Sequence, residues 1–201
     1  MYTLLTEAEI ATLLAQANHR SFHEDPFPQF AGHDPRAAAV LVPLAWVSGN
    51  WHVLYTRRTD IVEHHKGQVS FPGGATDPED SDPEATALRE ADEEIGLRPK
   101  DVRILGRLGE MRTVTNFLVT PVVAVIPWPY TFTVHTIEVS RVFTLPLKCL
   151  AYQDNWQEFI RKETQRSVII YFPYDGELLW GVTARITLEF IRAIGLLSSE
   201  A

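Results

Sequence analysis

The chain has 201 residues, of which 45% are hydrophobic and 10% aromatic, so it can bury the core of one domain and leaves little room for two. A formal net charge of -8 argues against a protein that follows a nucleic-acid backbone, because that role requires a basic face. The single cysteine, Cys149, excludes an intramolecular disulfide, and the lack of a signal-peptide pattern or a membrane-length apolar run leads us to expect a cytoplasmic protein.

The first predicted element is a helix that begins at Thr6. Thr6 and Glu9 have the spacing of a capping box, and apolar residues recur at helical intervals after them, up to about residue 18. Residues 20–35 contain three prolines and are expected to form an irregular connection.

Strands are expected next, because runs rich in β-branched and aromatic residues alternate with turn residues. These runs are residues 38–46, 51–57, 69–71, 103–108, 117–126, 138–144 and 168–171. The first two flank Ser48-Gly49-Asn50 and are predicted to form a hairpin. A turn at Pro146 and a closing helix over residues 183–197 complete the prediction.

A second helix is predicted over residues 83–95, between strands. Ser81 or Asp82 can cap its start, and Gly96 can end it. Strands in front, one helix in the middle and one at the end indicate an α/β fold with a mixed β-sheet sandwiched by helices. We divide the chain into residues 1–35, the first helix with its connection, and residues 36–201, the main domain.

Three acids of the central helix are the sharpest chemical feature of the sequence. Glu90, Glu93 and Glu94 are three or four residues apart, so their carboxylates project from one helix face. Like charges repel there, and a hard divalent cation with oxygen ligands is the partner that would compensate them. The alternative is an ordinary solvated acidic face, but the other side of the helix is apolar, which indicates a packed helix.

Two neighbouring features fit the metal interpretation. Arg89 lies four residues before Glu93 and can hold a carboxylate in place. Gly73 and Gly74, upstream of the helix, would let a tight loop bring its backbone close to the same cation.

The segment Arg89-Glu90-Ala91-Asp92-Glu93-Glu94-Ile95-Gly96-Leu97 resembles the second half of the Nudix box. The front half departs from it: counted back from Arg89, the glycine of the box falls on Ala75 and its first glutamate on Ser81. Asp80, Asp82 and Glu84 lie near that glutamate position. The resemblance implies a Nudix fold, an α/β/α sandwich, with Mg²⁺ or Mn²⁺ held by Glu90 and Glu94 and helped by Glu93.

A second resemblance concerns the coenzyme A pyrophosphatase branch of this superfamily. It is carried by Leu54-Tyr55-Thr56-Arg57-Arg58-Thr59, by His65-Lys66-Gly67-Gln68-Val69-Ser70-Phe71-Pro72-Gly73-Gly74 and by Trp180-Gly181-Val182-Thr183-Ala184. It implies hydrolysis of coenzyme A or its derivatives to 3',5'-ADP and a 4'-phosphopantetheine product. Arg57, Arg58 and His65, with Gly73 and Gly74, become candidate substrate-binding residues, although each basic residue could be an ordinary surface charge.

Hydrolysis of a diphosphate requires a base that takes a proton from the attacking water. Glu93 on the helix and Glu138 later in the chain are the candidates, assisted by Arg89, although Glu138 could instead be an exposed residue at a strand edge. Four aromatic residues could stack on adenine or fill the core: Trp51, Tyr55, Phe117 and Trp180.

Two other functions stay open at this point. One is a Nudix pyrophosphatase for another nucleoside diphosphate derivative, such as ADP-ribose or a dinucleotide cofactor. The other is a non-catalytic Nudix-fold binding module, which the complete set of Arg89 and the helix glutamates disfavours. We expect a small-molecule nucleotide substrate and no nucleic acid or membrane partner, and leave open a homodimer formed through the N-terminal helix.

Overall fold

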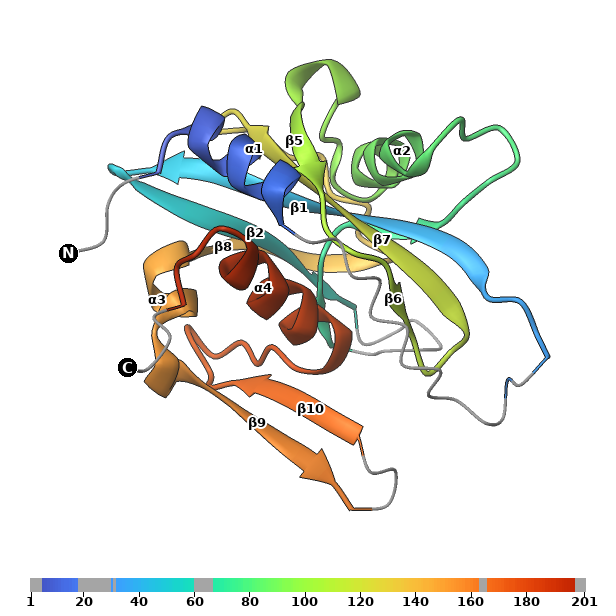
Figure 1. Cartoon of the computed structure of the whole chain (residues 1–201). Coiled ribbons are helices and arrows are strands. Elements are labelled where there is room, and N and C mark those ends of the chain that lie inside the picture. The colour runs from blue at the N-terminus through green and yellow to red at the C-terminus, as the bar shows by residue number, and fades with distance from the viewer. Residues whose placement is uncertain (1–4, 18–29, 31, 60–66, 163–165, 198–201) are drawn as a thin grey trace.

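The computed structural model describes residues 5–17, 30, 32–59, 67–162 and 166–197, in which an eight-stranded mixed sheet lies between helices (Figure 1). The strands of this sheet are β1 (Arg36–Val47), β2 (Asn50–Arg58), β3 (Val69–Ser70), β4 (Gly73–Ala75), β5 (Arg103–Arg107), β6 (Met111–Arg112), β7 (Phe117–Ile126) and β8 (Val139–Pro146). Strand β1 is central, being parallel to β7 and antiparallel to β2 and β4. Strand β8 pairs with β2.

The hairpin of β1 and β2 is confirmed. Its two strands are antiparallel, with Val47 opposite Asn50. Ser48 and Gly49 between them have φ values of 47° and 82°, and two successive positive φ values are typical of the tight turn that suits the twist of paired strands.

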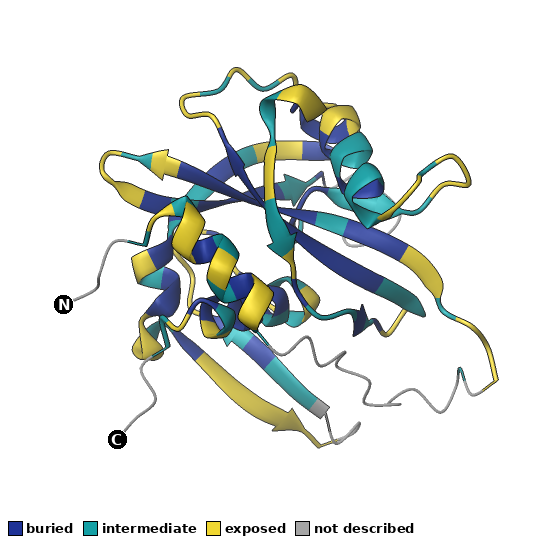
Figure 2. Ribbon diagram, turned by 45° about the horizontal axis from the view of Figure 1, so that its top comes forward, coloured by how far each residue is buried: buried dark blue, intermediate teal, exposed yellow. Residues whose placement is uncertain are grey.

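Helices cover both faces of the sheet, which confirms the α/β/α sandwich. Helix α2 (Pro83–Ile95) packs on one face, and α1 (Glu7–Gln16), α3 (Leu147–Ala151) and α4 (Gly181–Ala193) pack on the other (Figure 1). Successive side chains of a strand point to opposite faces, so Ala39 and Leu41 of β1 belong to the core cluster under α2, whereas Val42 and Leu44 belong to the cluster that includes α4. The central strands are therefore buried along most of their length (Figure 2).

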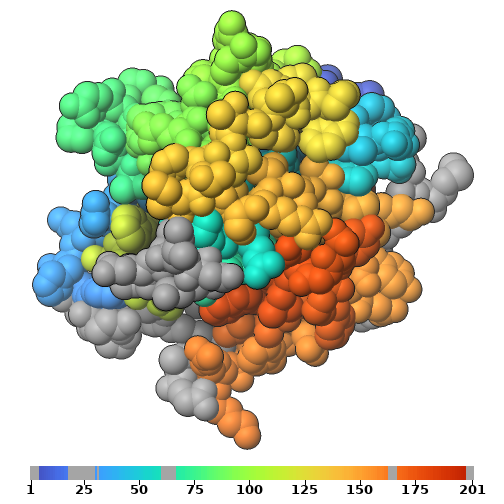
Figure 3. Space-filling model, turned by 180° about the vertical axis from the view of Figure 1, so that it is seen from behind, coloured from blue at the N-terminus to red at the C-terminus, as the bar shows by residue number. Residues whose placement is uncertain are grey.

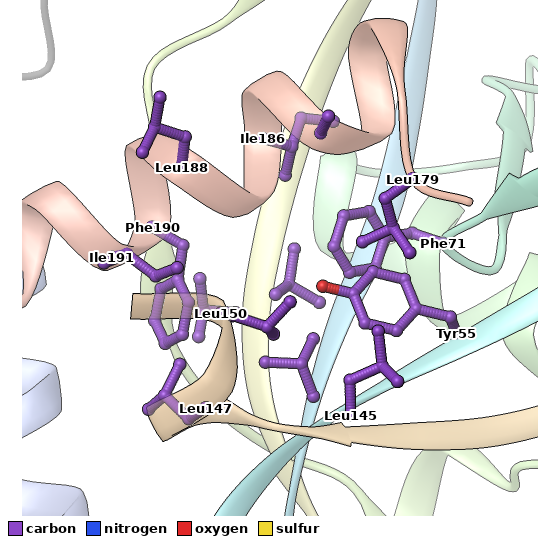
Figure 4. Close-up of a cluster of buried hydrophobic side chains, with 14 of the residues drawn as sticks. Tyr55, Phe71, Leu145, Leu147, Leu150, Leu179, Ile186, Leu188, Phe190 and Ile191 are labelled. Atoms are coloured by element: carbon purple, nitrogen blue, oxygen red, sulfur yellow. The ribbon is translucent and has the colours of Figure 1, made fainter. Parts of the chain in front are cut away.

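The larger core cluster contains two of the aromatic residues that could have contacted adenine. Tyr55 is fully buried among Phe71, Phe143 and residues of α4, and its hydroxyl lies 2.9 Å from Oγ1 of Thr187 (Figure 4). Trp51 is also buried. Both are therefore core residues, whereas Trp180 is exposed.

The caps predicted for the first two helices are present. Thr6 is the N-cap of α1 and forms the complete capping box with Glu9. Asp82, rather than Ser81, is the N-cap of α2 and accepts a hydrogen bond from the Ala85 N–H at 2.8 Å. Gly96 ends α2 in the left-handed conformation, with φ 67°.

The segment after Pro146 differs most from the sequence prediction. Pro146 is the N-cap of α3 rather than a turn, and β9 (Trp156–Arg161), which was not predicted, pairs with β10 (Arg166–Tyr171) in a separate two-stranded sheet. Most of β9 is exposed, and its apolar residues Trp156, Phe159 and Ile160 do not alternate with polar ones, so it lacks the pattern that marks a strand in sequence. The remaining short elements are the 3₁₀ helices Pro99–Asp101 and Gln153–Asn155. No helix among the described residues has the length and apolar character needed to cross a membrane.

Candidate active site

The three acids of α2 line one pocket with two residues from a distant part of the chain. Glu90, Glu93 and Glu94 meet His135 and Glu138, which lie between β7 and β8. Glu138 is in a turn that directly precedes β8, and its side chain is 44% exposed. The structure therefore brings Glu138 to the same face as the helix acids.

Backbone hydrogen bonds explain why this segment reaches the helix. The Thr133 N–H donates to the Ile95 carbonyl at 3.0 Å, and the His135 N–H donates to the Glu94 carbonyl at 2.8 Å. The last carbonyls of a helix lack hydrogen-bond donors within the helix. The segment between β7 and β8 supplies donors to the Glu94 and Ile95 carbonyls. In Figure 3 the gold surface of this segment lies against the green surface that includes α2. A Cβ on Gly96 would lie 2.8 Å from the Thr133 Cβ, so the close approach depends on glycine.

The turn that carries Glu138 is also attached to the end of β2. The Thr59 N–H donates to the Glu138 carbonyl at 2.9 Å, and the Thr59 hydroxyl donates to the Ile137 carbonyl at 2.6 Å. The backbone of Glu138 is thus held between α2 and β2.

Glu94 is the most deeply buried acid of the pocket, with a side chain that is 6% exposed. Burial raises its pKa to about 8; the Arg58 charge opposes this rise, and the charges of Glu90 and Glu138 add to it. The Gly73 N–H bonds to the carboxylate, but Oε2 is buried without a hydrogen-bond partner among the described residues. An isolated buried carboxylate oxygen is costly unless a proton or a cation compensates it.

Glu90 lies beside the glycine loop and is half-buried. Desolvation raises its pKa, and the contact with Arg89, 2.9 Å from Nη1 to Oε1, opposes the rise. A Cβ on Gly74 would lie 2.5 Å from Oε1 of Glu90, so the carboxylate occupies space that only glycine leaves free.

Arg89 organises the acids through a neighbour that the sequence left undecided. Its Nε and Nη2 donate to the two oxygens of Asp80 at 3.1 and 3.0 Å, and its Nη1 reaches Oε2 of Glu93 at 3.2 Å. The paired hydrogen bonds from Arg89 lower the pKa of Asp80 to about 2. Of the acids near the first glutamate of the box, Asp80 therefore contacts the arginine, whereas Asp82 caps α2 and Glu84 pairs with Arg107.

The donor set fits a hard divalent cation. Within the described ranges, no three His, Cys, Asp or Glu side chains are close enough together, as they stand, to hold a metal ion. The acids nevertheless line one pocket, Glu94 has a buried oxygen without a partner among the described residues, and the 61% exposed Glu93 is held at the pocket by Arg89. Carboxylate oxygens are the ligands that Mg²⁺ and Mn²⁺ prefer.

The three basic residues suggested by sequence have different positions. Nη1 of Arg58 lies 4.0 Å from Oε1 of Glu94, and its buried Nε has no hydrogen-bond partner among the described residues. Arg57 points elsewhere, with Nη1 3.9 Å from Glu177. His65 lies outside the described residues. Of the two that the structure describes, Arg58 is thus the one placed beside the acidic pocket.

Sequence reasoning missed His135. It lies in no motif, and its Nδ1 is 3.4 Å from Oε1 of Glu138. The structure also joins two of the segments that carried the resemblance, because the Thr183 hydroxyl donates to the Val69 carbonyl at 3.0 Å.

Comparison with known proteins gives a consistent result. The NUDIX domain family matches residues 35–159. A protein of Photorhabdus laumondii named uncharacterized Nudix hydrolase NudL is 35% identical over 170 residues, covering 84% of this chain and 90% of the relative. The protein of the same name from Pectobacterium atrosepticum is 39% identical over 155 residues, covering 77% and 80%.

Two solved structures share the fold. A MutT/nudix family protein from Enterococcus faecalis has a TM-score of 0.52 at 15% identity, covering 96% of this chain and 75% of that protein. The MutT protein from Methanosarcina mazei has a TM-score of 0.50 at 17% identity, covering 80% and 94%. At these identities the two matches show the architecture alone.

Proposed function

The chain belongs to the Nudix hydrolase family, and we propose that it hydrolyses the pyrophosphate bond of coenzyme A or a coenzyme A derivative with Mg²⁺ or Mn²⁺. The products would be 3',5'-ADP and a 4'-phosphopantetheine compound. The observation that supports this chemistry is the pocket itself, which four glutamates line and in which Glu94 has a buried oxygen without a partner among the described residues.

The choice of coenzyme A rests on the segments that resemble the coenzyme A pyrophosphatase branch. Two of them are adjacent in space, since Thr183 contacts Val69, and both lie at the end of β2 that leads to the pocket. Arg58, the neighbouring basic residue on β2, lies beside Glu94. These contacts support a single substrate surface built from the three segments.

Glu90 and Glu94 would hold the cation, with Glu93 completing the set. A bound divalent cation neutralises the oxygens of a diphosphate and makes an attacking water a stronger acid. Arg89 keeps Glu90 and Glu93 on the pocket face, and Asp80 in turn holds Arg89. Burial makes the ionised form of Glu94 costly in the metal-free protein, and a bound cation would supply the counter-charge that stabilises this form.

The remaining chemistry belongs to side chains of the chain. A carboxylate of the pocket, Glu138 or Glu93, accepts a proton from water as the water oxygen forms a bond to one phosphorus. The bond from that phosphorus to the bridging oxygen breaks, and the bridging oxygen leaves with the other phosphate. Arg58 can place its guanidinium against the diphosphate and offset the charge that accumulates there.

Purified protein incubated with Mg²⁺ or Mn²⁺ and coenzyme A tests the proposal. Release of 3',5'-ADP is expected from coenzyme A, its disulfide and at least one acyl derivative. A parallel panel of ADP-ribose, dinucleotide cofactors and nucleoside triphosphates shows whether the protein hydrolyses coenzyme A in preference to other substrates of the same reaction. Turnover of ADP-ribose alone would exclude coenzyme A as the substrate. No turnover of any diphosphate would exclude the proposal that the protein is a catalyst.

A further inference from the structure

His135 has no assigned role, yet it lines the pocket together with the four glutamates. Of the described residues that line the pocket, it is the only one with a basic side chain, and the other four are glutamates. Its backbone is fixed on both sides: its N–H donates to the Glu94 carbonyl at 2.8 Å, and its carbonyl accepts from the N–H groups of Glu138 and Val139 at 2.9 Å. The imidazole is thus presented to the pocket from a rigid position.

The backbone of Glu138 is equally constrained, but its carboxylate is not. The turn is held at His135 and at Thr59, so only side-chain rotation decides where the carboxylate points. The side chain is 44% exposed, and among the described residues its one ion-pair partner is His135, with 3.4 Å between Nδ1 and Oε1. The facing helix acids repel the Glu138 carboxylate. Without an attractive partner such as His135, this side chain would therefore rotate toward solvent.

Glu93, the other candidate base, is placed differently. One of its oxygens already receives a hydrogen bond from Nη1 of Arg89 at 3.2 Å, within the same side-chain network as Glu90. This placement suits a residue that shares the cation. The Glu138 carboxylate makes no such contact with an arginine among the described residues, and is available to a water molecule.

Resting on the proposed function, we propose that His135 is a positioning residue that turns Glu138 into the pocket and makes Glu138, rather than Glu93, the base for the attacking water. Nδ1 donates its hydrogen to Oε1 of Glu138, and the second oxygen of that carboxylate accepts the proton of the water. The 3.4 Å separation shortens when substrate completes the pocket, as hydrogen bonds of catalytic groups do on substrate binding.

Steady-state kinetics of five variants, one of them Glu93→Gln, test this inference on whichever diphosphate the wild type hydrolyses. His135→Ala is expected to lower kcat at least about tenfold with KM within about twofold, because a displaced base affects the chemical step rather than binding. Glu138→Gln should lower kcat by about 100-fold or more. The double variant should be no slower than Glu138→Gln alone, because the histidine acts through the carboxylate. His135→Gln, which keeps an N–H donor, should recover most of the activity.

Two controls separate positioning from general damage. His33→Ala removes an exposed imidazole that does not line the pocket and should leave kcat unchanged. Calorimetric titration of His135→Ala with Mn²⁺, which requires no turnover, should give a dissociation constant within about twofold of the wild type, since the helix acids are intact.

The outcomes are distinguishable. Unchanged kcat in His135→Ala, or a double variant that is slower by the product of the two single effects, overturns the role of His135. A larger loss of kcat in Glu93→Gln than in Glu138→Gln, both measured at saturating Mn²⁺, overturns the choice of base. A wild type that hydrolyses no diphosphate overturns the proposed function and this inference together.

Discussion

Gly74 faces the carboxylate of Glu90 so closely that a Cβ at residue 74 would lie 2.5 Å from Cδ of Glu90. A glycine of the β4 strand and a glutamate of α2 thus share one space, although 16 positions separate them in the sequence. The glycine is required for the position of a charged group rather than for a turn, since Gly74 has no positive φ.

Gly74→Ala is therefore expected to weaken metal binding with little effect on stability. The added methyl group meets only the end of a flexible side chain, so Glu90 rotates away and the Mn²⁺ dissociation constant rises about tenfold, whereas the free energy of unfolding changes by less than about 1 kcal/mol. Calorimetry and chemical denaturation measure the two quantities.

Gly73→Ala is the contrasting variant: its Cβ would collide with the backbone of Ala39 and Val40, and its φ is 156°, so a loss of stability above about 2 kcal/mol is expected. Equal effects of the two substitutions on stability would contradict this assignment.

Glu94→Gln should remove activity without destabilising the metal-free protein. The glutamine cannot supply a charged ligand, so kcat/KM should fall at least about 100-fold. The substitution also removes a buried carboxylate whose pKa is about 8, so the metal-free melting temperature at pH 8 should be equal or higher. Asp92→Asn, on the same helix but exposed and outside the pocket, is the matched control and should keep wild-type activity. Normal turnover by Glu94→Gln would exclude Glu94 as a ligand.

Metal affinity should depend on pH through Glu94. Because its folded pKa is about 8, above the ordinary glutamate value of 4.5, the metal-free folded protein binds more protons than the unfolded chain between these two values, and its stability falls as pH rises through this window. A cation must displace that proton, so the apparent affinity for Mn²⁺ should rise by up to about tenfold per pH unit from pH 6 to 8. Titration calorimetry at pH 7 in buffers of different ionisation enthalpy should count about one released proton. An affinity that is constant over this range would refute the linkage.

Asp80→Asn should act on the site through Arg89 and reduce stability at neutral pH but not near pH 2. The folded pKa of Asp80 is lowered to about 2, so its stabilising contribution is present above the unfolded value of 3.8 and is lost as pH falls toward 2. At pH 7 the variant should lose about 1 to 2 kcal/mol of unfolding free energy, allowing for solvent screening near the surface. Denaturation of both proteins from pH 7 to pH 3 measures whether the difference shrinks. Ser81→Ala, one position away, should change neither the stability at pH 7 nor its dependence on pH.

Several parts of the molecule follow from local sequence. The ends of α2 depend on Asp82 and Gly96, which act within a few residues of themselves, and the spacing of Glu90 and Glu94 places both on one face of any helix they form. The hairpin of β1 and β2 is similarly local. Strand β9 was not predictable in this way, because its exposed residues lack periodicity and its partner is β10.

The rest of the candidate site was decided by tertiary contacts. Nothing near Glu138 in the sequence indicates that it faces Glu94; that proximity arises because the segment before β8 satisfies the last carbonyls of α2 and is held by Thr59. The choice of Asp80 over Asp82 likewise depended on which side chain reaches Arg89. Sequence periodicity reports which residues share a face of one element, whereas burial, and with it the pKa of Glu94, depends on what the other elements place against that face.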